Sequence, residues 1–454
     1  MTQLIATNSV TAIVGLGLTG LSVARYMYNK GSAFVMVDSR EDPPMLAQFK
    51  KEFPTAAIEL GPLNVETLTA SVEMVVSPGV ALSTAAIAAA IEAGVPAIGD
   101  IELFSRAALA PIVAITGSNA KSTVTTLVGL MAQCAGVKVA VGGNIGIPAL
   151  DLLAASDTEL YVLELSSFQL ETTQKLSAKV ATILNISADH MDRYEGLPQY
   201  HAAKQRVYFG AEHVVINRGD VLTQPPLIDN CSRISFAATT PDFKQFGVIT
   251  QADGDYLAWQ FEPLLAVTEL KIKGRHNIEN ALAALALGQA VKLPMAAMLE
   301  ALREFPGLPH RCQWLGNFGG VDYYNDSKGT NVGATLAALD GLAGCVNKLI
   351  LIAGGVGKGA DFSALTKPLL KSCRAMLVLG EDADLLAAIA PNDFPVLAVD
   401  SLLTALQQAR ALAHTGDAVL LSPACASFDM FAGFEARGEA FIAALNQIMG
   451  DAND

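Results

Sequence analysis

The sequence predicts an α/β protein of three domains, built from parallel sheets that helices cover. Apolar runs alternate with helical patterns along most of the 454 residues, and such runs are typical of parallel strands buried on both faces. The length alone favours about three domains of ~150 residues each. The predicted strands are Val10–Val14, Phe34–Val37, Met74–Val76, Ile112–Thr116, Leu160–Leu165, Val180–Leu184, Val214–Ile216, Lys348–Ile352, Ala375–Leu379 and Ala418–Leu421.

Two breaks in the pattern predict the domain edges. One lies at Gly94–Gly99, before a new strand, and the other is the Pro/Gly joint Phe305–Pro309, where a helix should stop. We expect a Rossmann-like first domain, a central domain of the P-loop ATPase type and a Rossmann-like third domain. A change to short mixed segments over 231–274 predicts a small antiparallel insertion in the central domain. The expected domains are 1–99, 100–306 and 307–454.

Composition limits the partners that such a chain can bind. The net charge is −14, and an acidic protein is a poor non-specific binder of nucleic acid or of an anionic membrane. None of the six Cys residues forms a C-x-x-C pair, so neither a zinc site nor a disulfide framework is expected. The sequence shows neither a signal peptide nor a membrane span. We therefore expect a cytoplasmic protein with small-molecule substrates.

The first motif is Gly15-Leu-Gly-Leu-Thr-Gly20, which follows a predicted strand and opens a helix. The next strand leads to Asp38, about 20 residues on, which is the spacing of a dinucleotide-binding fingerprint. Its glycines allow a pyrophosphate to approach a helix N-terminus, although a turn needed only for packing is the alternative. The fingerprint does not distinguish NAD, FAD and a UDP-sugar. Arg40 is placed to meet a phosphate or a uracil edge.

The second motif is a candidate phosphate loop between a predicted strand and an apolar-periodic helix. Lys121 would reach the β- and γ-phosphates and Ser122 would hold Mg²⁺. The strict Walker pattern fails at Ile115 and Ala120, which occupy its glycine positions, so an ordinary capped helix start is the alternative. The predicted ATP-binding loop comprises Gly117, Ser118, Asn119, Ala120, Lys121, Ser122 and Thr123.

Charged residues follow the next two predicted strands. Glu164 lies near the carboxyl end of one strand, where open α/β sheets bind ligands and where Mg²⁺ finds the oxygen ligands it prefers. An acid that faces solvent is the alternative. The segment Asn185–Tyr194 at the next strand end contains His190, and Lys204 follows on a predicted helix. His190 is a candidate for a second Mg²⁺ or for orienting substrate, against a purely structural histidine.

Polar loops also follow predicted strands of the third domain, and together they indicate one site at a sheet edge. Each loop alone could be a simple turn. His276–Asn280 favours helix capping, although Asn280 is placed to contact a nucleotide. The polar segments are Pro309–Arg311, Asn325–Asn331, Gly354–Lys358 and Ser422–Asp429.

Together these motifs resemble those of the Mur ligases over almost the whole chain. The Asp-Asn-Pro-Arg motif of the member that adds a diamino acid does not occur in the sequence, which favours the branch that adds D-glutamate. The resemblance implies an ATP-dependent ligase of peptidoglycan synthesis that uses Mg²⁺, UDP-N-acetylmuramoyl-L-alanine and D-glutamate, and we expect a monomer. The most specific segments are Gly142–Gly146, Glu164–Glu171, Asp189–Tyr194, Gly307–Arg311 and Asn325–Lys328.

The resemblance also implies roles for individual residues. The UDP moiety would be lined by Leu18, Thr19, Asp38, Arg40 and Gly79, and the muramoyl-alanine end by Asn144 and His190. ATP would meet the phosphate loop together with Asn280, Arg311 and Asp326. The metals would be held by Ser122, Glu164, His190 and a carbamylated Lys204, and the catalytic residues would be Lys121, His190 and Lys204. D-glutamate would be surrounded by Lys328, Thr330, Lys358, Ser427 and Phe434.

One departure from the family concerns Ala120, because the loop of the family usually has glycine there. A left-handed backbone at this position would make alanine cost about 1–2 kcal/mol, whereas a right-handed backbone would cost nothing. An acid of the family is also replaced by Val356, to which we assign no role.

Two other protein classes fit part of the sequence. An NAD-dependent oxidoreductase would use the first motif but would leave the phosphate loop unexplained, and it would bind nicotinamide tightly. A P-loop NTPase switch would hydrolyse ATP without any amino acid.

Overall fold

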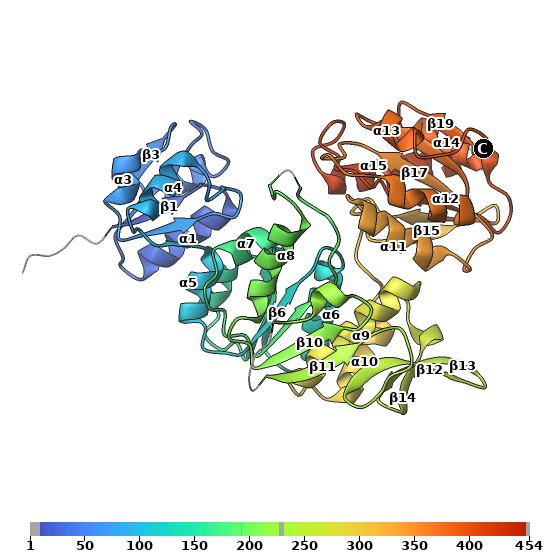
Figure 1. Ribbon diagram of the computed structural model, residues 1–454, viewed down its shortest axis with the longest axis horizontal. Helices are drawn as coiled ribbons and strands as arrows, with labels where there is room; N and C mark the ends of the chain where they lie inside the picture. Colours follow the sequence, from blue (N-terminus) through green and yellow to red (C-terminus); the bar gives the residue numbers. More distant parts are fainter. Residues whose placement is uncertain (1–9, 192, 227–230, 451–454) are drawn as a thin grey trace, which may run out of the picture.

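The computed structural model describes residues 10–191, 193–226 and 231–450. It contains three sheets with helices packed against them, which confirms the predicted α/β class. Figure 1 shows the first body (blue) and the third (orange) on opposite sides of the central one. The start of the chain, where we expect no signal peptide, and Asp192 of the Asp189–Tyr194 segment lie outside the described residues. None of the described helices is long and apolar enough to cross a membrane.

The first sheet has the order β3-β2-β1-β4-β5, and all of its strands are parallel. Its strands are short runs of apolar residues, and β1 is buried along its whole length, as expected for a sheet covered on both faces. The strands are β1 (Thr11–Val14), β2 (Phe34–Asp38), β3 (Ala57–Leu60), β4 (Glu73–Val76) and β5 (Ala97–Ile98), and the helices are α1 (Leu18–Asn29), α2 (Leu46–Glu52), α3 (Val65–Thr69) and α4 (Ala85–Glu92).

The central sheet has the order β14-β13-β12-β11-β10-β9-β6-β8-β7. The strands from β7 to β12 are parallel, and β13 and β14 add an antiparallel edge to the same sheet. These two strands lie within the segment 231–274, for which we predicted a small antiparallel insertion. The strands are β6 (Ile112–Thr116), β7 (Val139–Gly143), β8 (Leu160–Glu164), β9 (Val180–Ile183), β10 (His213–Asn217), β11 (Ser232–Phe236), β12 (Gln245–Gln251), β13 (Gly254–Trp259) and β14 (Glu262–Ala266), and the helices are α5 (Asp100–Ala107), α6 (Lys121–Cys134), α7 (Ser167–Glu171), α8 (Leu197–Gln205), α9 (Arg275–Ala290) and α10 (Met295–Glu304).

The third sheet has the order β15-β16-β20-β17-β18-β19, with only the edge strand β15 antiparallel. Its strands are β15 (Gln313–Phe318), β16 (Val321–Asn325), β17 (Leu349–Gly354), β18 (Cys373–Leu379), β19 (Val396–Ala398) and β20 (Ala418–Leu421), and its helices are α11 (Val332–Leu342), α12 (Thr366–Ser372), α13 (Ala383–Ala387), α14 (Leu402–Leu412) and α15 (Phe434–Gly450).

Apolar cores fill the space on both faces of the central sheet. On one face, residues of α6, α9 and α10 form a core with the inward side chains of the strands. The core on the other face is continuous with residues of the first sheet, from Ile13 to Tyr161 and Ile216. Parallel strands bring their carboxyl ends to one edge of each sheet, and the polar loops lie at these edges. The exact domain boundaries at 99/100 and 306/307 stay predictions.

Candidate active site

Three cavities at the sheet edges bring the predicted site residues together. The edge cavity, of about 580 Å³, lies at the first sheet. The loop cavity, of about 340 Å³, surrounds the phosphate loop. The junction cavity, of about 630 Å³, lies between α9, the 306–308 joint and the third sheet.

All of the predicted site residues except Gly117 line one or more of these cavities. The edge cavity takes Leu18, Thr19, Asp38, Arg40, Gly79 and Asn144. The loop cavity takes Ser118, Asn119, Ala120, Lys121, Ser122, Asn144, Glu164, His190, Lys204, Arg311, Lys328, Thr330, Lys358, Ser427 and Phe434. The junction cavity takes Asn119, Ala120, Thr123, Asn280, Arg311, Asp326 and Lys328.

The glycine turn at the edge cavity packs as the first motif predicts. A Cβ on Gly20 would lie 1.9 Å from the carbonyl oxygen of Gly15, so the third glycine allows α1 to approach the strand. Asp38 accepts hydrogen bonds from the N–H of Leu16 (2.6 Å) and from Nη2 of Arg40 (2.7 Å). Burial raises the pKa of Asp38, but these hydrogen bonds bring it below its ordinary value. Since the carboxylate of Asp38 already accepts hydrogen bonds from Arg40, a ribose hydroxyl would have to compete with Arg40 for the carboxylate.

The phosphate loop connects β6 to α6, and Ala120 is its last residue before the helix. Ala120 has φ 66° and ψ −4°, which is the left-handed region that disfavours a Cβ. Of the two backbone conformations considered for Ala120, the structure has the left-handed one, which is costly for alanine. The loop therefore keeps the turn of a glycine although the residue is alanine.

Replacing Ala120 with glycine is expected to raise the free energy of unfolding by about 0.5–1 kcal/mol. Relief of the left-handed alanine contributes about 1–2 kcal/mol, and the added freedom of glycine in the unfolded chain offsets about 0.5–1 kcal/mol of it. Urea unfolding of the purified chain measures the difference. Ala135, the residue that caps the C-terminus of the same helix, has φ −80°, so Ala135→Gly should lower stability instead. Equal losses in the two variants would contradict the prediction.

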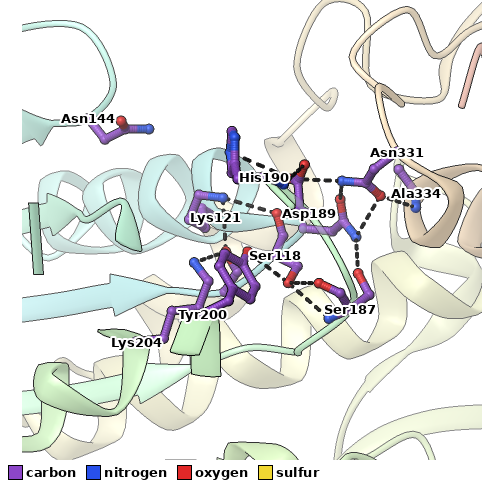
Figure 2. Close-up of polar contacts among 12 residues, drawn as sticks. Ser118, Lys121, Asn144, Ser187, Asp189, His190, Tyr200, Lys204, Asn331 and Ala334 are labelled. Carbon is purple, nitrogen blue, oxygen red and sulfur yellow. Dashed lines mark hydrogen bonds and ion pairs between the residues drawn. The ribbon is translucent and has the colours of Figure 1, made fainter. Parts of the chain in front are cut away.

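Two lysine amines converge on one carbonyl oxygen of this loop (Figure 2). The Nζ atoms of Lys121 and Lys204 each donate to the carbonyl oxygen of Gly117 at 2.9 Å. Lys204 is 1% exposed and its Nζ lies 4.7 Å from the ring centre of Tyr200. Burial, and then the charge of Lys121, place the pKa of Lys204 well below 10.5. Burial also lowers the pKa of Lys121. The site therefore disfavours two ammonium charges and favours a neutral amine at Lys204.

Glu164, at the end of β8, presents one carboxylate oxygen that is suited to a cation. Its Oε1 accepts a hydrogen bond from Nδ2 of Asn144 at 2.7 Å, whereas Oε2 is buried without a hydrogen-bond partner. A buried oxygen of this kind is costly unless a ligand satisfies it. Over the described ranges, no group of three or more His, Cys, Asp or Glu side chains forms a metal site. A divalent cation at Glu164 would therefore take its other ligands from Ser122, from a modified lysine or from bound phosphates.

His190 lies on the far wall of the loop cavity. Its backbone is left-handed with φ 57°, and its ring centre lies 4.9 Å from that of Phe168. The adjacent Asp189 carboxylate accepts a hydrogen bond from Nδ2 of Asn331 at 3.1 Å, which joins the central domain to the third (Figure 2).

Side chains of the third domain reach both the loop and the junction cavities. Nη2 of Arg311 donates to Oγ of Ser122 at 2.6 Å, so an arginine that follows the Phe305–Pro309 joint contacts the first turn of α6. Nζ of Lys328 lies 3.7 Å from the ring centre of Phe434, and burial lowers the pKa of Lys328 to about 8. Burial raises the pKa of Asp326 to about 7. Arg311 and Lys328 thus bring two basic side chains to the wall that the loop and junction cavities share.

The sequence matches three family models, which follow one another along the chain. They are the Mur ligase MurD-like N-terminal domain at residues 9–99, the Mur ligase middle domain at 115–288, and the Mur ligase glutamate ligase domain at 310–425. A UDP-N-acetylmuramoylalanine--D-glutamate ligase of Pseudomonas aeruginosa is 55% identical over 98% of this chain and 100% of its own length. The chain belongs to the Mur ligase family. The enzyme of the same name from Saccharophagus degradans is 50% identical, over 97% of this chain and 98% of its own.

Solved structures of Mur ligases share the fold of this Mur ligase. MurF from Acinetobacter baumannii matches with a TM-score of 0.59 and 14% identity, over 96% of this chain and 90% of that one. UDP-N-acetylmuramate-alanine ligase MurC from Thermotoga maritima matches with a TM-score of 0.56 and 18% identity, over 96% and 99%. Like its family, this Mur ligase is an ATP-dependent enzyme that forms amide bonds in peptidoglycan synthesis, and the family implies a divalent cation. The oxidoreductase and switch alternatives find no support among the relatives.

Sequence reasoning assigned no role to two polar residues that hold the loops of this Mur ligase site. Asn331, the last residue of the predicted polar segment Asn325–Asn331, caps α11 and links Asp189 to Asn119, and its position directly before a helix was the available signal for this role. Arg437, 3% exposed, donates to the carbonyl oxygens of Ser327, Cys425 and Gly354, and so ties three loops together. Arg437 lies one turn inside α15, where the sequence pattern did not set it apart.

Proposed function

We propose that this Mur ligase joins D-glutamate to UDP-N-acetylmuramoyl-L-alanine through an acyl phosphate. The observation that carries the proposal is that the three cavities share walls. Asn144 lines both the edge and the loop cavities, and Asn119, Ala120, Arg311 and Lys328 line both the loop and the junction cavities. A sugar nucleotide, ATP and an amino acid bound in them would meet at the phosphate loop.

The edge cavity suits the UDP part of the acceptor. The glycine turn offers backbone N–H groups at the start of α1 to a pyrophosphate, and Leu18, 64% exposed, offers an apolar surface to a base. Arg40 and Gly79 complete the walls. The lactoyl-alanine end would then extend past Asn144 towards His190, and its carboxylate would lie in the loop cavity.

The junction and loop cavities suit ATP. Asn280, Arg311 and Asp326 would contact the nucleoside, and the loop from Gly117 to Thr123 would hold the phosphates. The carboxylate oxygen of the alanine would attack the γ-phosphorus, so that an O–P bond forms and the bond to ADP breaks. Lys121 would offset the charge on the transferring oxygens, because a fixed cation stabilises the transition state more than the ground state.

Mg²⁺ fits the residues of the loop cavity. Glu164 supplies an unpartnered buried oxygen, Ser122 supplies a hydroxyl, and His190 and a carbamylated Lys204 would hold a second ion. The ions would neutralise phosphate charge during transfer.

Carbamylation of Lys204 is supported by its surroundings. The neutral amine favoured there can attack CO₂, which forms an N–C bond, releases one proton and leaves a carboxylate. That change places an anion beside the ammonium group of Lys121, so the buried cation of Lys121 gains an opposite charge.

The third domain would supply the amino acid. Lys328 and Lys358 would pair with the two carboxylates of D-glutamate, with Thr330, Ser427 and Phe434 around it. Its neutral amine would attack the acyl carbon and lose one proton, so that the C–N bond of the amide forms and the C–O bond to phosphate breaks. Because water would hydrolyse the acyl phosphate, closure of the third domain over the loop cavity would protect it. We also expect the enzyme to act as a cytoplasmic monomer.

An omission assay tests the proposed function. Phosphate release is expected only when UDP-N-acetylmuramoyl-L-alanine, D-glutamate and Mg-ATP are all present, because each step needs the product of the one before. Omitting each compound in turn, and replacing D-glutamate by L-glutamate, measures the dependence. Equal phosphate release without an amino acid would favour an NTPase, and release with any amino acid would remove the assignment of D-glutamate.

A further inference from the structure

Arg193 connects the edge cavity to the loop cavity across the boundary between the first and central bodies. Its Nη1 donates to the carbonyl oxygen of Pro78 at 3.3 Å, and its Nη2 to that of Val80 at 3.4 Å. Pro78, Gly79 and Val80 form the loop after β4 and all line the edge cavity. The guanidinium therefore holds the loop of the first domain that would contact the sugar nucleotide.

The same guanidinium contacts the wall of the loop cavity. It lies 4.6 Å from the ring centre of Phe168, and Phe168 packs against the ring of His190. Both of these aromatic residues line the loop cavity. Nη2 of Arg193 also pairs with the carboxylate of Glu171 at 2.8 Å, with side-chain exposures of 17% and 19%, so the arginine is held in one orientation.

The backbone adds a second connection from Arg193 to His190. The N–H of Arg193 donates to the carbonyl oxygen of His190 at 2.9 Å, and that of Tyr194 donates to the same oxygen at 3.2 Å. This turn starts at the left-handed His190. Movement of the loop at Pro78–Val80 would therefore displace both the backbone and the ring of His190.

We propose that Arg193 is a positioning residue that sets the reach of the acceptor from the edge cavity to the reacting centre in the loop cavity. The proposal rests on the proposed function, because the sugar nucleotide is the ligand that would span these cavities. An acceptor held at both ends needs a fixed spacing between its two sites, and an error of about 1 Å can cost about a hundredfold in rate. Arg193 fixes that spacing through two carbonyl groups on one side and the Phe168 ring on the other.

The test compares Arg193→Ala with a matched interdomain variant. Arg106→Gln removes another arginine that crosses the same boundary, since Arg106 of α5 pairs with Glu73 of β4 at 3.0 Å and lines none of the three cavities. For Arg193→Ala we expect KM for UDP-N-acetylmuramoyl-L-alanine to rise at least about tenfold and kcat to fall, with KM for ATP within about twofold. For Arg106→Gln we expect all three constants within about twofold.

A lysine variant separates positioning from folding. Arg193→Lys keeps a cation over Phe168 but loses the planar fork, so its KM for the sugar nucleotide should lie between those of the wild type and of Arg193→Ala. An unchanged KM across this series, or a loss explained by a lower melting temperature alone, would overturn the proposal. An inactive wild-type enzyme in the same assay would instead overturn the proposed function.

Discussion

Replacing Lys121 with alanine is expected to lower kcat by at least about a thousandfold, which corresponds to about 4 kcal/mol of transition-state stabilisation. Lys121 begins α6, and its Nζ already lies at the loop carbonyl oxygens of Gly117 (2.9 Å) and Ser118 (3.0 Å). The transferring phosphoryl group would take over these contacts and would be left without a fixed cation in the variant. Phosphate release under saturating substrates measures the effect.

A control variant distinguishes this effect from a general loss of charge. Lys138→Ala removes a lysine that lies between α6 and β7. Lys138 pairs with Asp157, and its side chain is 63% exposed. Its kcat should stay within about twofold of the wild type. The melting temperature of Lys121→Ala should not fall, because the change removes a cation whose burial is unfavourable. Activity above about a tenth of the wild type would contradict the role of the phosphate loop.

Most of the fold follows from local sequence signals. Ten predicted strands appear in the three sheets because runs such as Ile112–Thr116 and Ala418–Leu421 are apolar enough to be buried on both faces. Short or exposed strands were missed. Ala57–Leu60 alternates between exposed and partly buried positions, and Ala97–Ile98 spans two residues. The pairing of such strands depends on neighbours distant in the sequence, which local patterns do not contain.

The clustering of the candidate site was predictable because it depends on topology. Glu164 ends β8 and Asn185 follows β9, and these two parallel strands flank β6, so the sheet itself brings both residues to one edge. Contacts between domains were not predictable from the residues. The link from Asn331 to Asp189 and that from Arg193 to Pro78 depend on how separate sheets are placed, and each is a hydrogen bond with no periodic signal in the sequence.

The backbone of the phosphate loop shows a different limit. The sequence defined two possible backbone conformations for Ala120, right-handed and left-handed, and the energy of each. Which one occurs depends on the relative positions of β6 and α6. The sheet and the packing of α6 against α9 and α10 fix those ends, so tertiary structure imposes φ 66° on an alanine.

Lys204→Ala is expected to lower kcat at least about a hundredfold and to respond to added small carboxylates such as formate or acetate. The carbamate would provide a carboxylate for a metal ion, and alanine leaves a space in which a free carboxylate can substitute for it. Initial rates with and without the added acid, over a concentration series, measure the rescue. Lys179→Ala, which changes a lysine of a surface ion pair with Glu212, should neither lose activity nor respond to the acid.

The carbamate itself can be observed independently of activity. With ¹³C-labelled bicarbonate, the wild type should show a carbamate carbon signal that Lys204→Ala lacks and Lys179→Ala keeps. The signal should weaken as the pH falls, because CO₂ reacts with the neutral amine and protonation of Lys204 competes with that reaction. The lowered pKa of Lys204 extends the reactive form to lower pH than an exposed lysine would allow. A plain Lys204→Ala variant with the wild-type rate, or a wild type without the signal, would mean that the buried amine acts only as a hydrogen-bond donor to the loop.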